Sequence, residues 1–298
     1  MAAEPCELTT LNEAFRRFAF PAESTQTSDH IKRLHWYVAC RLVIEGGFDP
    51  DTIQPRPPFK VTESQGKKLL HHEPNLANGK ERTIYGGLKT KDIDVSICLD
   101  GVGPVLAISL KGTHNAFRNL TNRMEEAAGD CTNLHLAYPA MVYGFWHLLR
   151  ANEQADENPK AHFALGDTGR YRVEDLAITE GGNLAQGVAR YAQALVRLSD
   201  REDLRDSPSR YEACALTLVG VRGAAIGITH PLVHETGAIL DFNRMFRRLL
   251  DLYDRRFVYQ APAMDVRTRR CTWSTESPVL EEIIRKHPAF GELIPRTS

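Results

Sequence analysis

The chain has 298 residues, enough to bury a sizeable core in one elaborated α/β domain or in two modest ones. Hydrophobic residues make up 42% and charged residues 25%, which excludes a largely disordered chain. The formal net charge is −1, so the chain lacks the basic excess of a protein that coats nucleic acid without specificity. Any binding to nucleic acid therefore requires a local basic groove.

Cysteine spacing and hydropathy exclude two further classes. The six cysteines stand singly with no CxxC pair, so we expect reduced thiols and no zinc site. No segment approaches the roughly 18 uninterrupted apolar residues of a membrane span, and the N-terminal residues lack a signal-peptide pattern. We expect a cytoplasmic protein with no membrane partner.

The N-terminal region is predicted to be mainly helical. Residues 9–20 form a short helix opened by Thr9 or Thr10. Residues 28–45 form a longer helix, capped by Ser28 or Asp29 and stopped by the glycine pair at 46–47. A proline-rich loop follows, and residues 62–73 are predicted as a third helix.

The middle of the chain changes character at residue 91. KDIDVSICL and PVLAISLK are short β-branched runs separated by DGVG, which predicts a hairpin turning at residues 100–103. A polar helix follows at about 114–128, and LHLAYPAMVYGFWHLL is predicted to begin as a buried strand and to continue as helix. This order indicates a mixed sheet with a helical crossover.

The last third of the chain is predicted to contain two helices and one strand. GGNLAQGVARYAQALVRLSDRED and LDFNRMFRRLLDLYDRR have helical patterns, and YEACALTLVGV between them is a probable buried strand. The tail from about 260 to 298 is expected to be irregular.

The predicted hairpin places chemical groups on one face. If paired residue numbers sum to 203, Asp94 lies opposite Ser109, and Lys111 shares the face of Ser109 because strand side chains alternate. Apolar residues cover the other face. A carboxylate and an ammonium brought together in this way suit metal-dependent phosphodiester hydrolysis, in which a hard cation is held and a lysine serves the attacking water.

One acid is missing from the hairpin, because Ser109 stands where a second carboxylate is expected. The following helix offers Glu125, which shares a face with Arg118 and Asn122 at helical spacing. If that face turns to the hairpin, Glu125 replaces the missing acid. The simpler interpretation of Asp94, Lys111 and Glu125 is that they are ordinary surface charges.

Asp94, then Ser109-Leu110-Lys111, then Glu125 resembles the variant PD-(D/E)xK site of restriction enzymes that cut around a CCGG core, in which SxK replaces ExK and the acid moves to the next helix. The resemblance implies that Asp94, the Leu110 carbonyl and Glu125 bind Mg2+. The resemblance does not extend to the DNA sequence that is recognised. At the start of the helix those enzymes carry basic and acidic residues that contact the bases, whereas this chain has Asn115 there.

The resemblance implies an α/β fold with a restriction-endonuclease-like mixed central sheet flanked by helices and extended by N- and C-terminal helices. We expect one endonuclease domain over residues 1–298, with an N-terminal helical region at 1–60, a catalytic core at 60–230 and a helical extension at 231–298. The implied function is that of a type II restriction endonuclease cutting double-stranded DNA with Mg2+. Two cuts in a palindrome predict a homodimer, or a tetramer.

Two other functions stay open, namely another PD-(D/E)xK nuclease acting in repair, at junctions or on modified DNA, and an inactive nuclease-like DNA-binding protein. Several further residues are candidates. The predicted DNA contacts on the helix are Asn115, Arg118, Asn119 and Arg123. Phosphate contacts are possible at Lys89 and Lys91, and cleft-lining cations at Arg244, Arg247 and Arg248. An additional N-terminal acid would come from Glu45, Glu63 or Glu73, and the less favoured HNH-like site would use His71, His72 and His114.

Overall fold

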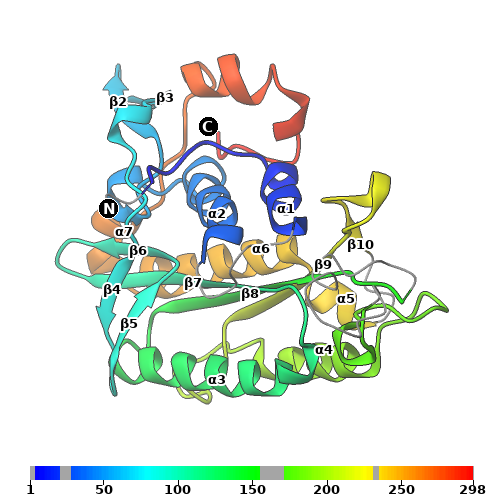
Figure 1. Cartoon of the computed structure of the whole chain (residues 1–298). Coiled ribbons are helices and arrows are strands. Elements are labelled where there is room, and N and C mark those ends of the chain that lie inside the picture. The colour runs from blue at the N-terminus through cyan, green and yellow to red at the C-terminus, as the bar shows by residue number, and fades with distance from the viewer. Residues whose placement is uncertain (1–3, 21–27, 155–170, 231–234, 298) are drawn as a thin grey trace.

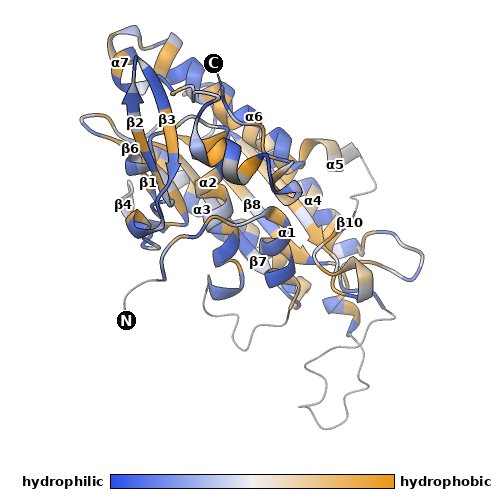
Figure 2. Cartoon of the chain, turned by 90° about the horizontal axis from the view of Figure 1, so that it is seen from above, coloured by the Kyte–Doolittle hydropathy of each residue, from blue (hydrophilic) through white to orange (hydrophobic). Residues whose placement is uncertain are grey.

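A computed structural model describes residues 4–20, 28–154, 171–230 and 235–297 of the chain. The molecule is mixed α/β, with a central six-stranded sheet between two layers of helices (Figure 1). The hairpin of β2 (Phe59–Ser64) and β3 (Lys67–His72) lies at one end of the molecule with helix α7 (Asp265–Thr268). Strand β10 (Thr229–His230) lies at the other end, as the view from above also shows (Figure 2). Among the described residues, none of the helices combines the length and apolar character needed to cross a membrane.

The central sheet has the strand order β1-β6-β7-β8-β9-β10. Its strands are β1 (Ile53–Gln54), β6 (Val95–Leu99), β7 (Gly103–Thr113), β8 (Val142–Arg150), β9 (Ala213–Val219) and β10 (Thr229–His230). The pairs β7–β8 and β8–β9 are parallel and the other neighbours are antiparallel. The predicted mixed sheet is therefore confirmed, and helix α3 (Leu120–Ala137) makes the expected crossover between β7 and β8.

Helices cover both faces of this sheet (Figure 1). One layer contains α1 (Leu11–Ala19), α2 (Lys32–Ile44) and α6 (Phe242–Tyr253). The opposite layer contains α3 and α4 (Gln186–Leu198), with α5 (Glu235–Ile239) close to the edge at β9, and α7 (Asp265–Thr268) belongs to the tail. Two clusters of buried apolar side chains, one on each face, join the layers to the sheet.

The two N-terminal helices are where the sequence predicts them. Thr10 caps α1, since its side chain accepts from the backbone of Glu13, whose carboxylate in turn accepts from the Thr10 backbone. Helix α2 begins later than expected, at Lys32, after a 3₁₀ turn at Ser28–His30, and its N-cap residue Ile31 provides no side-chain bond. The capping of α2 by residue 28 or 29 was therefore wrong.

The helix predicted at residues 62–73 is wrong. The segment forms the hairpin of β2 (Phe59–Ser64) and β3 (Lys67–His72), joined by Gln65 and Gly66 with φ of 50° and 73°. Two consecutive residues with positive φ make a tight two-residue turn that matches the twist of paired strands. The turn therefore decides the structure of this segment.

The segment after α3 was also predicted in the wrong order. Residues 134–137 continue the helix, and the strand β8 begins at Val142 after a turn at residues 138–141. Nine consecutive buried residues in β8 explain the error, because a strand buried on both faces has no alternation to mark its start. The tail from residue 260 consists mainly of short turns, as expected.

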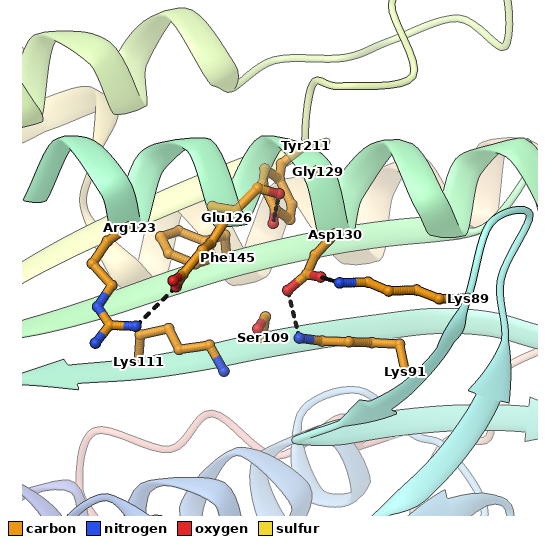
Figure 3. Close-up of a pocket in the computed structure, with 11 residues that line it drawn as sticks. Lys89, Lys91, Ser109, Lys111, Arg123, Glu126, Gly129, Asp130, Phe145 and Tyr211 are labelled. Carbon is orange, nitrogen blue, oxygen red and sulfur yellow. Dashed lines mark hydrogen bonds and ion pairs between the residues drawn. The ribbon is translucent and has the colours of Figure 1, made fainter. Parts of the chain in front are cut away.

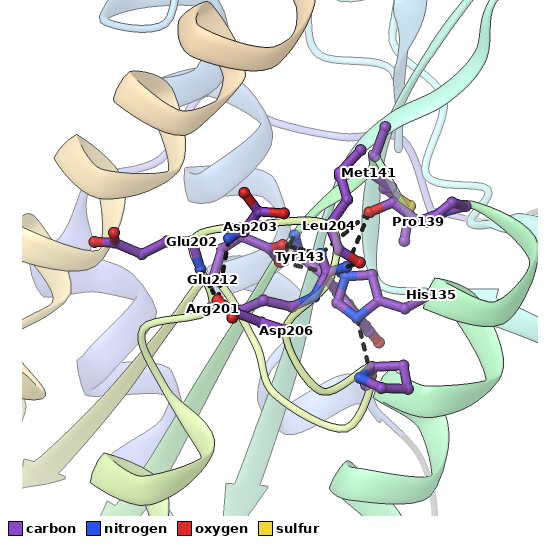
Figure 4. A network of polar contacts seen from close by, with 12 residues as sticks. His135, Pro139, Met141, Tyr143, Arg201, Glu202, Asp203, Leu204, Asp206 and Glu212 are labelled. Atoms are coloured by element: carbon purple, nitrogen blue, oxygen red, sulfur yellow. Dashed lines mark hydrogen bonds and ion pairs between the residues drawn. The ribbon is translucent and has the colours of Figure 1, made fainter.

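A buried ionic network joins the helical layers at the amino end of β9 (Figure 4). The Glu212 carboxylate accepts from Arg201 and Arg256, both at 2.7 Å, and from the backbone of Tyr143 at 2.8 Å. The His135 imidazole lies 3.3 Å from the same carboxylate. Burial raises the pKa of Glu212, but His135, Arg256 and the Tyr143 bond outweigh it and hold the pKa below its ordinary value. The network is thus built around a charged carboxylate.

Candidate active site

Asp94 occupies the point where two hairpins meet. It lies between β5 (Thr90–Ile93), which pairs with β4 (Arg82–Tyr85), and β6, which pairs with β7. The register of β6 and β7 sets Val95 opposite Ile108, as the sum of 203 predicts. The residue before Val95 therefore lies next to Ser109. The register shifts after Ile97, so the pairing predicted at the turn end of the hairpin is wrong by one residue.

The Ser109-Leu110-Lys111 segment surrounds one oxygen of Asp94. The Oδ2 atom accepts hydrogen bonds from the Ser109 hydroxyl at 3.1 Å and from the Leu110 backbone N–H at 2.7 Å. The Lys111 ammonium lies 3.3 Å from the same oxygen. All hydrogen bonds found to Asp94 within the described residues end on Oδ2, which leaves Oδ1 for another partner.

Asp94 is held in its charged form. Burial raises its pKa, but the cationic Lys111, the nearby His35 and the bonds from Leu110 and Ser109 outweigh the burial and lower the pKa. The carboxylate is therefore ionised at neutral pH. Ser109 orients this carboxylate, and Leu110 contributes its N–H to it, while the binding of a metal by the Leu110 carbonyl stays a prediction.

A second group of side chains approaches Asp94 from elsewhere in the chain. The register of β4 and β5 sets Arg82 opposite Ile93, so Glu81 lies across from Asp94. Helix α2 contributes His35, whose Nδ1 is 3.3 Å from Oε1 of Glu81. The potential ligand atoms of His35, Glu81 and Asp94 all lie within 4.8 Å of one another, so these three side chains could hold a metal ion.

A cavity of about 490 Å³ opens beside this site, between the hairpin and helix α3 (Figure 3). Ser109 and Lys111 line it from the sheet. Its other charged lining residues are Lys89, Lys91, Arg123, Glu126 and Asp130. Four cations face two carboxylates, so the lining is positive overall and is suited to a phosphate group.

Ion pairs set the shape of the cavity before any ligand enters. Lys91 contacts Asp130 at 2.5 Å, and Lys89 contacts the other oxygen of Asp130 at 3.4 Å. Arg123 pairs with Glu126 at 2.8 Å, one turn further along the helix. Lys111 also lines the cavity, but its ammonium extends away from this pair (Figure 3) and lies 3.3 Å from Oδ2 of Asp94.

Glu125 does not lie where the sequence places it. Its side chain is exposed and does not line the cavity, whereas Glu126 and Asp130 do. The phase of α3 follows from its buried positions Ala127, Cys131 and Leu134, which turn the neighbouring residues 126 and 130 to the sheet. The structure therefore does not bring Glu125 into the cavity that Ser109 and Lys111 line, whereas Glu126, the next residue along the helix, lies there.

The other candidates are spread over the molecule. Arg118 is exposed and paired with Glu174 at 2.7 Å, Asn119 is exposed just before α3, and Asn115 is half-buried. Of the four predicted DNA contacts, Arg123 alone lines the cavity. His114 is buried with its ring against Phe18 and His30. His71 bonds to Thr62 on the neighbouring strand, and His72 ends strand β3 and is exposed.

The proposed N-terminal acids and C-terminal cations are accounted for elsewhere. Glu45 pairs with Arg41, Glu63 is exposed on the β2–β3 hairpin, and Glu73 is half-buried just after it. The cations Arg244 and Arg248 pair with Asp200, and Arg247 is exposed. The acid that approaches Asp94 is Glu81, which was missed. The run ERTIYGGLKTKDID contains the signal, because a hairpin with GGLK, residues 86–89, as its turn sets the first Glu of the run opposite its last Asp.

Comparison of the chain with known protein families, with curated proteins and with solved structures finds no match.

Proposed function

We propose that the chain is a metal-dependent endonuclease that hydrolyses phosphodiester bonds in double-stranded DNA. The observation that carries the proposal is the convergence of Asp94, Ser109 and Lys111 at the edge of a cavity whose charged lining residues are mainly cations. The resemblance to the D…SxK site of PD-(D/E)xK enzymes adds to it. The restriction-endonuclease-like fold, the type II restriction activity and the use of Mg2+ belong to this proposal.

The residues of the site have separate tasks in this proposal. The three cations Lys89, Lys91 and Arg123 bind phosphate oxygens and hold the scissile bond in the cavity. The Lys111 ammonium stabilises negative charge at the reacting phosphate and positions the attacking water. Asp94, fixed by Ser109 and the Leu110 N–H, holds the divalent cation. When bound, that cation supplies Lewis-acid neutralisation of the phosphate and lowers the pKa of water.

Strand β7 carries no acidic residue beside Lys111. In this proposal, a carboxylate from a neighbouring element takes the part that the resemblance assigns to the acid on the helix. Glu81 approaches Asp94 from β4, and Glu126 faces the cavity from α3. A restriction enzyme that cuts both strands of a palindrome needs two copies of this site, and a homodimer is therefore part of the proposal.

Plasmid cleavage tests the function. Wild-type protein with Mg2+ or Mn2+ should convert supercoiled plasmid into discrete linear fragments, and Lys111→Ala should cut more than about a hundredfold more slowly. Lys111→Ala should still shift duplex DNA in a gel with Ca2+, because the other three cavity cations remain. Lys60→Ala is the matched control, since Lys60 is exposed on β2 and does not line the cavity.

The outcomes separate the candidate functions. Discrete fragments from unmodified plasmid indicate a restriction enzyme, and cleavage confined to junctions, damaged or methylated DNA indicates another nuclease. Duplex binding without cleavage in any divalent cation would reject the enzyme and leave a DNA-binding protein. Equal cleavage by wild type and Lys111→Ala would remove the proposed site from the reaction.

A further inference from the structure

The proposed nuclease site does not by itself explain the environment of His35. The imidazole is about 1% exposed, on a helix whose residues from Leu34 to Ile44 are all buried. Its Nε2 atom is buried and has no hydrogen-bond partner among the described residues. A buried polar atom without a partner costs free energy of the order of 1–3 kcal/mol. The other ring nitrogen, Nδ1, is the one that faces Glu81, at 3.3 Å from its Oε1.

The two carboxylates beside this ring pose a complementary problem. Glu81 and Asp94 approach each other in a mainly buried site, and Lys111 neutralises the Oδ2 side of Asp94. Two like charges at this separation repel each other unless a cation lies between them. A divalent cation bound by one imidazole nitrogen of His35 and by the two carboxylates would remove this repulsion.

The distances are close to those of a metal site. Bonds of about 2.0–2.2 Å at ordinary coordination angles separate neighbouring ligand atoms by about 3.0–3.6 Å. The His35 and Glu81 atoms are already 3.3 Å apart, and the widest separation in the group is within 4.8 Å. The Glu81 side chain is 32% exposed, so it has room to close on an ion and leaves a path for entry.

We propose that His35, Glu81 and Asp94 form a mixed imidazole–carboxylate site for a first-row transition-metal dication such as Mn2+ or Co2+. Mg2+ and Ca2+ take oxygen ligands, whereas a neutral imidazole binds transition metals. The site therefore prefers Mn2+ or Co2+ to Mg2+. The inference rests on the proposed function for what the ion does in the cavity, and binding of the ion itself is a property of these three side chains.

Co2+ binding to the chelator-treated full-length protein tests the site without any DNA. Visible absorption should report one Co2+ per chain, and His35→Gln should weaken its binding by more than about tenfold, equivalent to about 1.4 kcal/mol. Glu81→Gln should weaken it similarly, and because Glu81 is partly exposed, this second variant keeps the test valid if His35→Gln fails to fold. His72→Ala is the matched control, because this histidine is exposed on β3.

The nitrogen ligand has its own signature. Spin-echo spectra of the Mn2+ complex should show nitrogen modulation from a coordinated imidazole in the wild type and none in His35→Gln. The affinity for Mg2+, measured by competition, should change less than threefold in that variant, which corresponds to about RT of binding free energy. Circular dichroism of each variant shows whether the fold is kept.

The failures of the two proposals are distinguishable. The proposed metal site would be rejected by a wild-type Mn2+ complex without nitrogen modulation, or by equal Co2+ affinity in wild type, His35→Gln and Glu81→Gln. Neither result would contradict the proposed role of Lys111 in DNA cleavage. The opposite case is a wild-type protein that binds Co2+ tightly, loses this binding in both variants and cuts no DNA. That result would support the metal site and reject the nuclease function.

Discussion

Replacing Glu212 by Ala should destabilise the protein severely. The substitution leaves Arg201 and Arg256, whose side chains are 1% and 4% exposed, without their shared carboxylate. Removing one partner from a buried ion pair costs about 3–5 kcal/mol, because the remaining charge stays desolvated. A domain has only about 5–15 kcal/mol of stability, so the loss is a large part of the total.

The free energy of unfolding from urea titrations measures this effect. Glu212→Gln should lose less than Glu212→Ala, because its amide oxygen can still accept from the Tyr143 backbone N–H. Glu202→Ala is the matched control, since the Glu202 side chain is 59% exposed and pairs with Arg248, and it should cost less than about 1 kcal/mol.

The pKa of Glu212 determines the direction in which stability changes with pH. The pKa of Glu212 is lower in the folded chain than its ordinary value of 4.5, so its contribution to stability is present above 4.5 and is lost as the pH falls. The difference in the free energy of unfolding between wild type and Glu212→Gln should therefore become smaller below pH 4.5. A cost below about 1 kcal/mol for Glu212→Ala at neutral pH would refute the idea that buried charge holds this part of the fold.

Three further predictions concern the cavity and the core. Glu126→Gln should lower plasmid cleavage more than Glu125→Gln, because Glu126 lines the cavity; the reverse order would show that α3 turns its other side to the hairpin. Lys91→Ala should weaken duplex DNA binding and lower the slope of log affinity against log salt by about 0.9, as one lost phosphate contact does; an unchanged slope would exclude that contact. Burial, helped by Lys111 and Arg123, lowers the pKa of His147 to about 3 from 6.5, so stability should fall as the pH drops from 6.5 toward 3. His147→Gln should flatten this decline by up to about 1.4 kcal/mol per pH unit in urea titrations at stepped pH, and parallel curves for the two proteins would contradict the assignment.

Local patterns in the sequence determined much of the sheet and the first half of the site. Apolar alternation on either side of DGVG predicted the β6–β7 hairpin and the adjacency of Asp94 and Ser109, which depend on pairing between segments close in the chain. The capping box at Thr10 likewise needs only three neighbouring residues. Such features follow from the sequence because their energetics are local.

Helix phase and long-range approach were decided by tertiary packing. Both Glu125 and Glu126 fit a polar helix, and the burial of Ala127, Cys131 and Leu134 against the sheet chose which of them faces the cavity. The approach of His35 to Glu81 joins a helix in the α1–α2 layer to the start of β4, and no sequence spacing specifies that contact. The sequence by itself determined which strands carry Asp94 and Lys111, and packing alone decided which other side chains reach them, because side-chain burial depends on elements distant in the chain.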